Sequence, residues 1–188
     1  MIWNQTEFNN KVVAVAKKLN IKRFEAQLLL AQERFLIRLT SIEEGGGFVW
    51  KGLVSYFVNT CQKKPFDLQL ILTSLPKVSQ LSPQKIFLKK AMALDLNDGF
   101  TFDGLKKSFM ERDTPYGGER FEMDWSYFKK PNDPNNNSMK LKLDVCAGDD
   151  VAEEVVASEL LFATEGTGNL SFRIYPPELF LPRNSKQS

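Results

Sequence analysis

The chain has 188 residues, 43% of them hydrophobic, with 25 lysines and arginines against 23 aspartates and glutamates. This length favours one domain with one core, and the net charge of +2 confines any nucleic-acid contact to a local patch. There is no histidine, which excludes Ser-His-Asp and Cys-His catalysis and zinc sites with histidine ligands. Carboxylate, lysine and arginine chemistry remains, and phosphoryl or nucleotidyl transfer depends on those groups.

The two cysteines, Cys61 and Cys146, predict free thiols in a reducing compartment rather than a disulfide framework. The first residues lack the basic segment and apolar run of a signal peptide. No stretch approaches the roughly 18 apolar residues of a membrane span. We therefore expect a cytoplasmic protein without membrane contact.

The N-terminal part predicts two helices. The first covers about Glu7 to Leu19. The second covers about residues 22–40, where apolar side chains recur at the spacing of an amphipathic helix: Phe24, Leu28, Ala31, Phe35 and Leu39. Residues 43–47 include three consecutive glycines and predict a hinge before the next element.

Residues 48–72 predict a strand to Trp50, a glycine turn, a short helix towards Cys61 and a second strand after Pro65. In a strand, Asp67 and Gln69 face the same way, because side chains alternate between the two faces. Two carboxylates at that spacing can hold one Mg²⁺, and Gln69 offers only a neutral carbonyl in place of the second. Asp67 is therefore either a metal ligand or an ordinary carboxylate near the start of a strand.

The turn between these strands has two interpretations as well. Gly52 either lets backbone amides approach a phosphate or serves plain turn geometry. Lys51 either neutralises a triphosphate or is simply solvated, and the same alternatives hold for Arg120.

The second half predicts a helix that opens at Ser82-Pro83, a turn at Asp98-Gly99, and strands over about residues 119–128, 140–146 and 170–174. In the middle strand Leu141, Leu143 and Val145 point to the core, whereas Lys140, Lys142 and Asp144 share the other face. The order of elements predicts an α+β fold with a mixed sheet and helices mainly on one side.

Five segments carry a family resemblance. Lys51-Gly52-Leu53 followed by residues 66–70 matches a Lys-Gly-Gly turn before a strand of the form Asp-Leu-Asp-Leu. The other four segments are residues 98–103, 116–120, 143–149 and 175–178. In this order the chain resembles the AbiEii/AbiGii family of bacterial nucleotidyltransferase toxins, from abortive-infection and toxin–antitoxin systems.

The resemblance implies one nucleotidyltransferase-like domain over residues 1–181 and a disordered tail over 182–188. It implies transfer of a nucleotidyl group from an NTP to an acceptor hydroxyl with Mg²⁺, tRNA being a candidate acceptor and a cognate antitoxin a candidate partner. Asp67 and Asp144 would bind metal and act in catalysis. The nucleotide would contact Lys51, Gly52, Leu53 and Gln69.

Three departures from the family pattern favour an alternative. Leu53 replaces a second small residue, Gln69 replaces the second aspartate, and residues 179–188 do not contain the family's Ala-Glu-Lys helix. The alternative is a degenerate, non-catalytic member that retains the fold and acts by binding. On that interpretation Asp144 is a solvated residue beside Lys140 and Lys142.

Lysines supply one further candidate. These lysines either form a patch that binds the RNA backbone or lie on solvated helix faces. The set consists of Lys63, Lys64, Lys85, Lys89, Lys90, Lys106 and Lys107.

Overall fold

In the computed structural model, the described residues are 3–42, 48–51, 68–72, 83–109, 118–128, 138–147, 154–158 and 170–174. Their elements, in chain order, are helices α1 (Gln5–Leu19), α2 (Arg23–Thr40) and α4 (Pro83–Ala93), and strands β1 (Phe48–Lys51), β2 (Leu68–Leu72), β3 (Phe100–Phe109), β4 (Gly118–Tyr127), β5 (Met139–Ala147), β6 (Glu154–Ser158) and β7 (Leu170–Ile174). The α+β prediction is confirmed. None of the helices in these segments is long and apolar enough to cross a membrane.

One mixed sheet joins the strands in the order β3-β4-β5-β2-β1-β7-β6. The strands β3, β4 and β5 pair antiparallel, while β5 pairs parallel with β2. On the other side of β2, β1 is antiparallel to it and parallel to β7. The strand β2, which begins directly after Asp67, therefore lies in the middle of the sheet.

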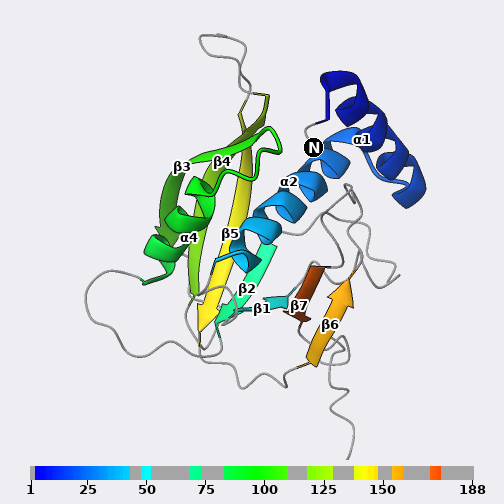
Figure 1. Cartoon of the computed structure of the whole chain (residues 1–188). Coiled ribbons are helices and arrows are strands. Elements are labelled where there is room, and N and C mark those ends of the chain that lie inside the picture. Colours follow the sequence, from blue (N-terminus) through cyan, green and yellow to red (C-terminus); the bar gives the residue numbers. More distant parts are fainter. Residues whose placement is uncertain are drawn as a thin grey trace, which may run out of the picture.

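The helices cover one face of the strands β3 to β5. Figure 1 shows α2 running across the sheet, with α1 on its outer side and α4 beside β3. Aromatic pairs join the layers, since the Phe35 ring lies 5.2 Å from that of Phe102 and the Phe8 ring lies 4.1 Å from that of Tyr127. Under the helices lie the apolar side chains predicted for β5 and their neighbours on β4: Leu141, Leu143, Val145, Phe121, Met123 and Trp125.

Local signals explain where the first helix begins and ends. The Asn4 side chain accepts a hydrogen bond from the Glu7 amide, and the Glu7 carboxylate accepts one from the Asn4 amide, which is a capping box. The helix ends at Asn20, whose left-handed backbone (φ 53°) suits asparagine better than most residues. The predicted bounds of this helix are thus close to those observed.

The second helix differs from the expectation of a simple amphipathic stripe. Ala31, Phe35 and Leu39 are buried as predicted, but Phe24 is 56% exposed, so the stripe is wrong at its first position. The second half of α2 is enclosed on its polar side as well, because Gln32, Glu33, Arg34 and Arg38 are all buried. An enclosed helix must pair its polar groups internally.

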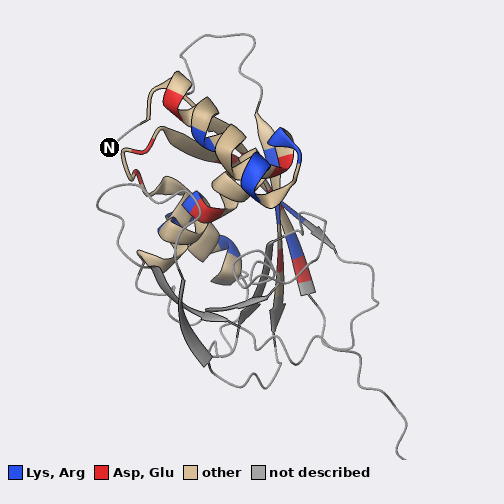
Figure 2. Cartoon of the chain, turned by 90° about the vertical axis from the view of Figure 1, so that its right-hand side faces the viewer, with Lys and Arg blue, Asp and Glu red and all other residues tan. Residues whose placement is uncertain are grey.

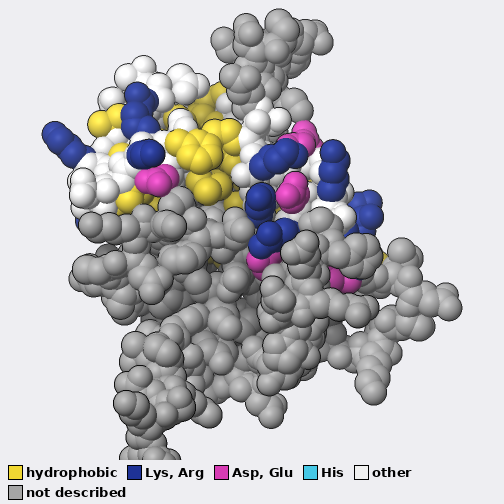
Figure 3. Space-filling model, turned by 180° about the vertical axis from the view of Figure 1, so that it is seen from behind, with side chains coloured by type: hydrophobic (Ala, Val, Ile, Leu, Met, Phe, Trp, Pro, Cys, Tyr) yellow, Lys and Arg dark blue, Asp and Glu magenta, His cyan; other side chains and the backbone are white. Residues whose placement is uncertain are grey.

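The face of β3, β4 and β5 opposite the helices is polar. Seen from behind, lysine, arginine and carboxylate side chains stand close together on this side (Figure 3). The register between β4 and β5 places Asp124 opposite Lys140 and Glu122 opposite Lys142. Side chains of opposite charge face each other across these strands, so neither sign dominates this face, and charges of both signs are also mixed along the helices (Figure 2).

Candidate functional site: a polar row across four strands

Strand pairing brings four residues that the sequence analysis considered into one line across the sheet. Lys51 is paired with Gln69, Gln69 with Asp144, and Asp144 with Arg120. Residues directly opposite each other in a sheet share a face, so these four positions lie side by side on β1, β2, β5 and β4. We call Lys51, Gln69, Asp144 and Arg120 the polar row.

Asp144 lies on the face of β5 opposite the helices. Leu143 and Val145, the neighbours of Asp144 along β5, are buried on the helix side, and alternation directs Asp144 to the other face. The sequence correctly predicted that Asp144 shares this face with Lys140 and Lys142. It did not predict burial, and the interpretation of Asp144 as a solvated residue is wrong, because its side chain is only 2% exposed.

Arg120 holds the Asp144 carboxylate with two parallel hydrogen bonds. Its Nε donates to Oδ1 over 2.6 Å, and its Nη2 donates to Oδ2 over 2.7 Å. Both distances are at the short end for charge-assisted bonds, and the paired geometry fits the planar fork of arginine. Arg120 itself is 33% exposed, so the pair is buried at its acidic end and reaches solvent at its basic end.

The remaining predicted positions are described only in part or not at all. The structure gives the backbone positions of Lys51 and Gln69 within the row. Gly52, Leu53 and Asp67 lie outside the described residues, as do the predicted helix towards Cys61, the lysines 63 and 64, the loop 131–137 and the segments from 175 onwards. The strand β2, which begins at Leu68, is paired with β5, the strand of Asp144.

Magnesium is the metal that the resemblance implies, and the described part of the row does not fit it. Mg²⁺ needs near-octahedral oxygen ligands at about 2.0–2.1 Å, usually with one or two carboxylates. Asp144 is the one carboxylate of the row, and both of its oxygens already accept bonds from a guanidinium. Within the described segments, no three or more acidic or cysteine side chains come together as a metal cluster. A metal site would therefore depend on Asp67.

A second polar cluster, which the sequence analysis missed, lies where α2 meets the turn between α4 and β3. Arg38 donates two bonds to the Asp98 carboxylate, over 2.7 and 2.9 Å, and further bonds to the carbonyls of Arg34, Leu94 and Phe100. Burial lowers the pKa of the neighbouring Arg34, and Glu33 next to it acts in the opposite direction. In the sequence, the signal that could have indicated this cluster was the position of Arg38 close to the apolar stripe of the predicted helix.

The predicted lysine patch is only partly assembled. Lys89 and Lys106 line an open hollow of about 630 Å³ between α4 and β3, together with Met92 and Phe102. Lys107 is instead ion-paired with Glu119 on β4. Lys89 and Lys106 thus line one hollow, whereas Lys107 has an acidic partner on the neighbouring strand.

No protein-family model matches this chain, and a search of curated proteins finds no match either. The resemblance to the AbiEii-like toxins therefore depends on the five sequence segments alone.

Proposed function

We propose that this chain is a nucleotidyltransferase-fold protein of the AbiEii-like toxin family, which binds an NTP at the polar row and transfers its nucleotidyl group to an acceptor hydroxyl. The observation that carries this proposal is the position of β2. The strand that follows Asp67 is paired with β1 on one side and with β5 on the other. Lys51, Gln69 and Asp144 are thereby gathered beside the end of the strand where Asp67 lies in sequence.

The residues have separate roles in this proposal. Lys51 and the adjoining Gly52 and Leu53 lie where the phosphates of the NTP bind, and the lysine offsets their charge. Asp67 holds the Mg²⁺ that this chemistry uses, and Gln69 contributes a neutral oxygen. Asp144 can accept a proton from the acceptor hydroxyl only after Arg120 has moved away from one of its oxygens. The acceptor class that the resemblance suggests is tRNA, and a cognate antitoxin is the suggested partner.

A specific observation favours a second candidate, a non-catalytic member that binds without transfer. Asp144 is both buried and paired with Arg120, and the position opposite it on β2 is Gln69 rather than a carboxylate. The row therefore lacks the surplus negative charge that a divalent cation requires. In this case the protein still binds an NTP or a partner protein, but it forms no nucleotidylated product.

One experiment with two measurements tests both candidates. The protein is incubated with each labelled NTP, Mg²⁺ and tRNA, and product is followed for the parent and for Asp67→Asn. The proposal predicts NTP turnover that falls at least 100-fold in the variant, a loss of about 2.7 kcal/mol in transition-state stabilisation. Equal turnover in parent and variant would reject the role of Asp67.

Melting temperature with each NTP supplies the second measurement, because a ligand that binds only the folded state raises it. A nucleotide-dependent rise without any product identifies the non-catalytic candidate. If millimolar NTP does not raise the melting temperature and no product forms, nucleotide binding is contradicted altogether. The ion pair between the exposed Lys140 and the partly buried Asp124 offers a control, since Lys140→Gln removes a positive charge from the same sheet face.

A further inference from the structure

The burial of Asp144 requires a positive charge close to it. An ionised carboxylate taken out of water is strongly destabilising unless a cation and hydrogen bonds compensate it. Two kinds of cation can do this on a sheet face: a bound divalent ion, or a basic side chain from a neighbouring strand. For Asp144 the structure provides the second, because Arg120 is its direct partner across β4 and β5.

The geometry of the pair leaves little room for a metal at the same oxygens. The guanidinium lies along the carboxylate, with Nε at Oδ1 and Nη2 at Oδ2. A divalent ion bound there would stand close to a fixed positive charge, which Coulomb repulsion disfavours most where water is excluded. The paired position on β2, Gln69, adds no negative charge to offset that repulsion.

We infer that Arg120 neutralises Asp144 in place of a divalent cation, so that Asp144 binds no Mg²⁺ while Arg120 is present. Arg120 is thus a positioning residue: its two hydrogen bonds hold the Asp144 carboxylate fixed across the two strands without any metal. Folding of this part of the sheet is then independent of Mg²⁺. The inference does not depend on NTP turnover, and any Mg²⁺ used with an NTP must be held elsewhere, with Asp67 as the assigned ligand.

The test compares melting temperatures in EDTA and in millimolar Mg²⁺, without nucleotide, for four proteins: the parent, Arg120→Gln, Asp144→Asn, and the double variant Arg120→Gln/Asp144→Asn. We expect Arg120→Gln in EDTA to melt roughly 10 °C below the parent, because it leaves a buried carboxylate uncompensated. Mg²⁺ should restore part of this loss, since the carboxylate then has no competing guanidinium.

The double variant distinguishes this role from a purely structural one. Its amide at position 144 is uncharged and offers a divalent ion only a neutral oxygen. It should therefore regain most of the lost melting temperature in EDTA and show no response to Mg²⁺ beyond that of Asp144→Asn alone. A merely structural ion pair would also lose stability in Arg120→Gln, but it would gain no metal response. Lys140→Gln, with the same charge change at a pair whose lysine is 54% exposed, should leave both readings unchanged.

Two results would overturn the inference. One is a rise of the parent's melting temperature with Mg²⁺ that disappears in Asp144→Asn, because Asp144 would then bind metal beside Arg120. The other is an Arg120→Gln variant without a Mg²⁺ response. If Arg120→Gln does not fold in EDTA, its recovery is measured by refolding in EDTA or Mg²⁺, and failure in both also overturns the inference. None of these readings uses NTP turnover, so the proposed function is judged separately.

Discussion

Two buried arginine–aspartate pairs in this protein use the same chemistry in different surroundings. Arg38 and Asp98 join α2 to the turn after α4, and Arg120 and Asp144 join β4 to β5. Arg38 is 1% exposed and Asp98 11%, so the first pair is enclosed at both ends. In the second pair only the acid is enclosed. The first pair is therefore closed off from solvent, whereas the second reaches solvent through its arginine.

Hydrogen bonding sharpens the contrast. The Arg38 guanidinium makes five bonds, which uses every N–H that an arginine side chain has. It also lies 5.0 Å from the centre of the Phe102 ring. Arg38 cannot exchange any of these partners without breaking the junction between α2, α4 and β3. Arg120 has a third of its side chain in solvent, so its charge can respond to a ligand or to a substitution.

The largest effect is expected for Arg38→Ala. It leaves Asp98 without its counter-ion and three backbone carbonyls without their donor, so the free energy of unfolding should fall by about 3–5 kcal/mol. Urea unfolding followed by circular dichroism measures this change. Arg23→Ala is the matched control, because Arg23 is an exposed arginine in the same helix and its loss should cost less than about 0.5 kcal/mol. A loss below about 1 kcal/mol for Arg38→Ala would refute its structural role.

The next prediction sets the two acids against each other. Asp98→Asn leaves a guanidinium enclosed without a counter-ion and should cost roughly 2–3 kcal/mol. Asp144→Asn should cost only about 1 kcal/mol, because the partly exposed Arg120 can be hydrated in place of its lost ion pair. The same urea experiment compares them, and both variants change one carboxylate to its amide. Equal losses, or a larger loss for Asp144→Asn, would show that exposure of the arginine does not separate the pairs.

The sequence allowed the separate elements to be predicted better than the contacts between them. The helices α1, α2 and α4 and the strands β5 and β7 follow from periodicity and from local start and stop signals. The strand β3 was missed because its alternation is interrupted: Gly104, with φ +65°, lies at an irregularity in the pairing with β4. The strand β6 is as short as β7 but lacks its alternation, because Val155, Val156 and Ala157 are consecutive apolar residues.

The part of the site that could be predicted from the sequence is the part that lies within a single strand. The common face of Lys140, Lys142 and Asp144 follows from alternation within β5. The polar row does not, because it depends on which strands are neighbours and in which register, and those pairings join distant segments. Arg120 and Asp144 were each noticed in the sequence for other reasons. Nothing local indicated that the first would neutralise the second.

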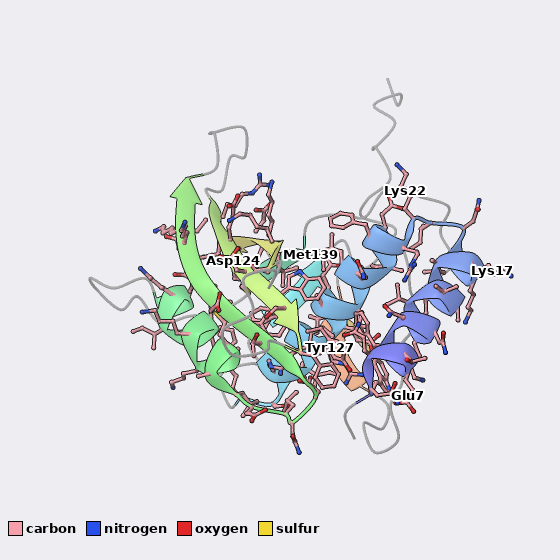
Figure 4. The ribbon with its side chains drawn as sticks, turned by 90° about the horizontal axis from the view of Figure 1, so that it is seen from above. Glu7, Lys17, Lys22, Asp124, Tyr127 and Met139 are labelled. Carbon is pink, nitrogen blue, oxygen red and sulfur yellow. The ribbon has the colours of Figure 1, made fainter. Side chains whose placement is uncertain are left out.

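The smallest predicted effect concerns Tyr127, and it tests how far the charge of the enclosed pair reaches. Tyr127 lies beside the start of α1, near Glu7 (Figure 4), and its hydroxyl donates a bond to the Trp3 carbonyl over 2.6 Å. Burial raises the pKa of Tyr127 to about 12, and the negative charge of Asp98 adds to the rise.

A tyrosine pKa that is higher in the folded protein than the ordinary value of about 10 stabilises the fold below pH 10. Between about pH 10 and 12 the unfolded chain releases the phenolic proton while the folded protein keeps it, so this contribution declines as pH rises. Tyr127→Phe should therefore flatten the fall in stability over that range, and the difference between parent and variant measures it. Asp98→Asn should lower the pKa of Tyr127 but leave it above its ordinary value, because desolvation is the larger cause. Tyrosinate absorbance, taken as the difference from Tyr127→Phe in each background, reports that shift. The corresponding change of the second pair, Asp144→Asn, is the control, since Asp144 is not among the groups that act on Tyr127. A Tyr127 pKa that responds equally to both substitutions would mean that the field of the enclosed pair is not local, and the contrast between the two pairs would then be one of exposure alone.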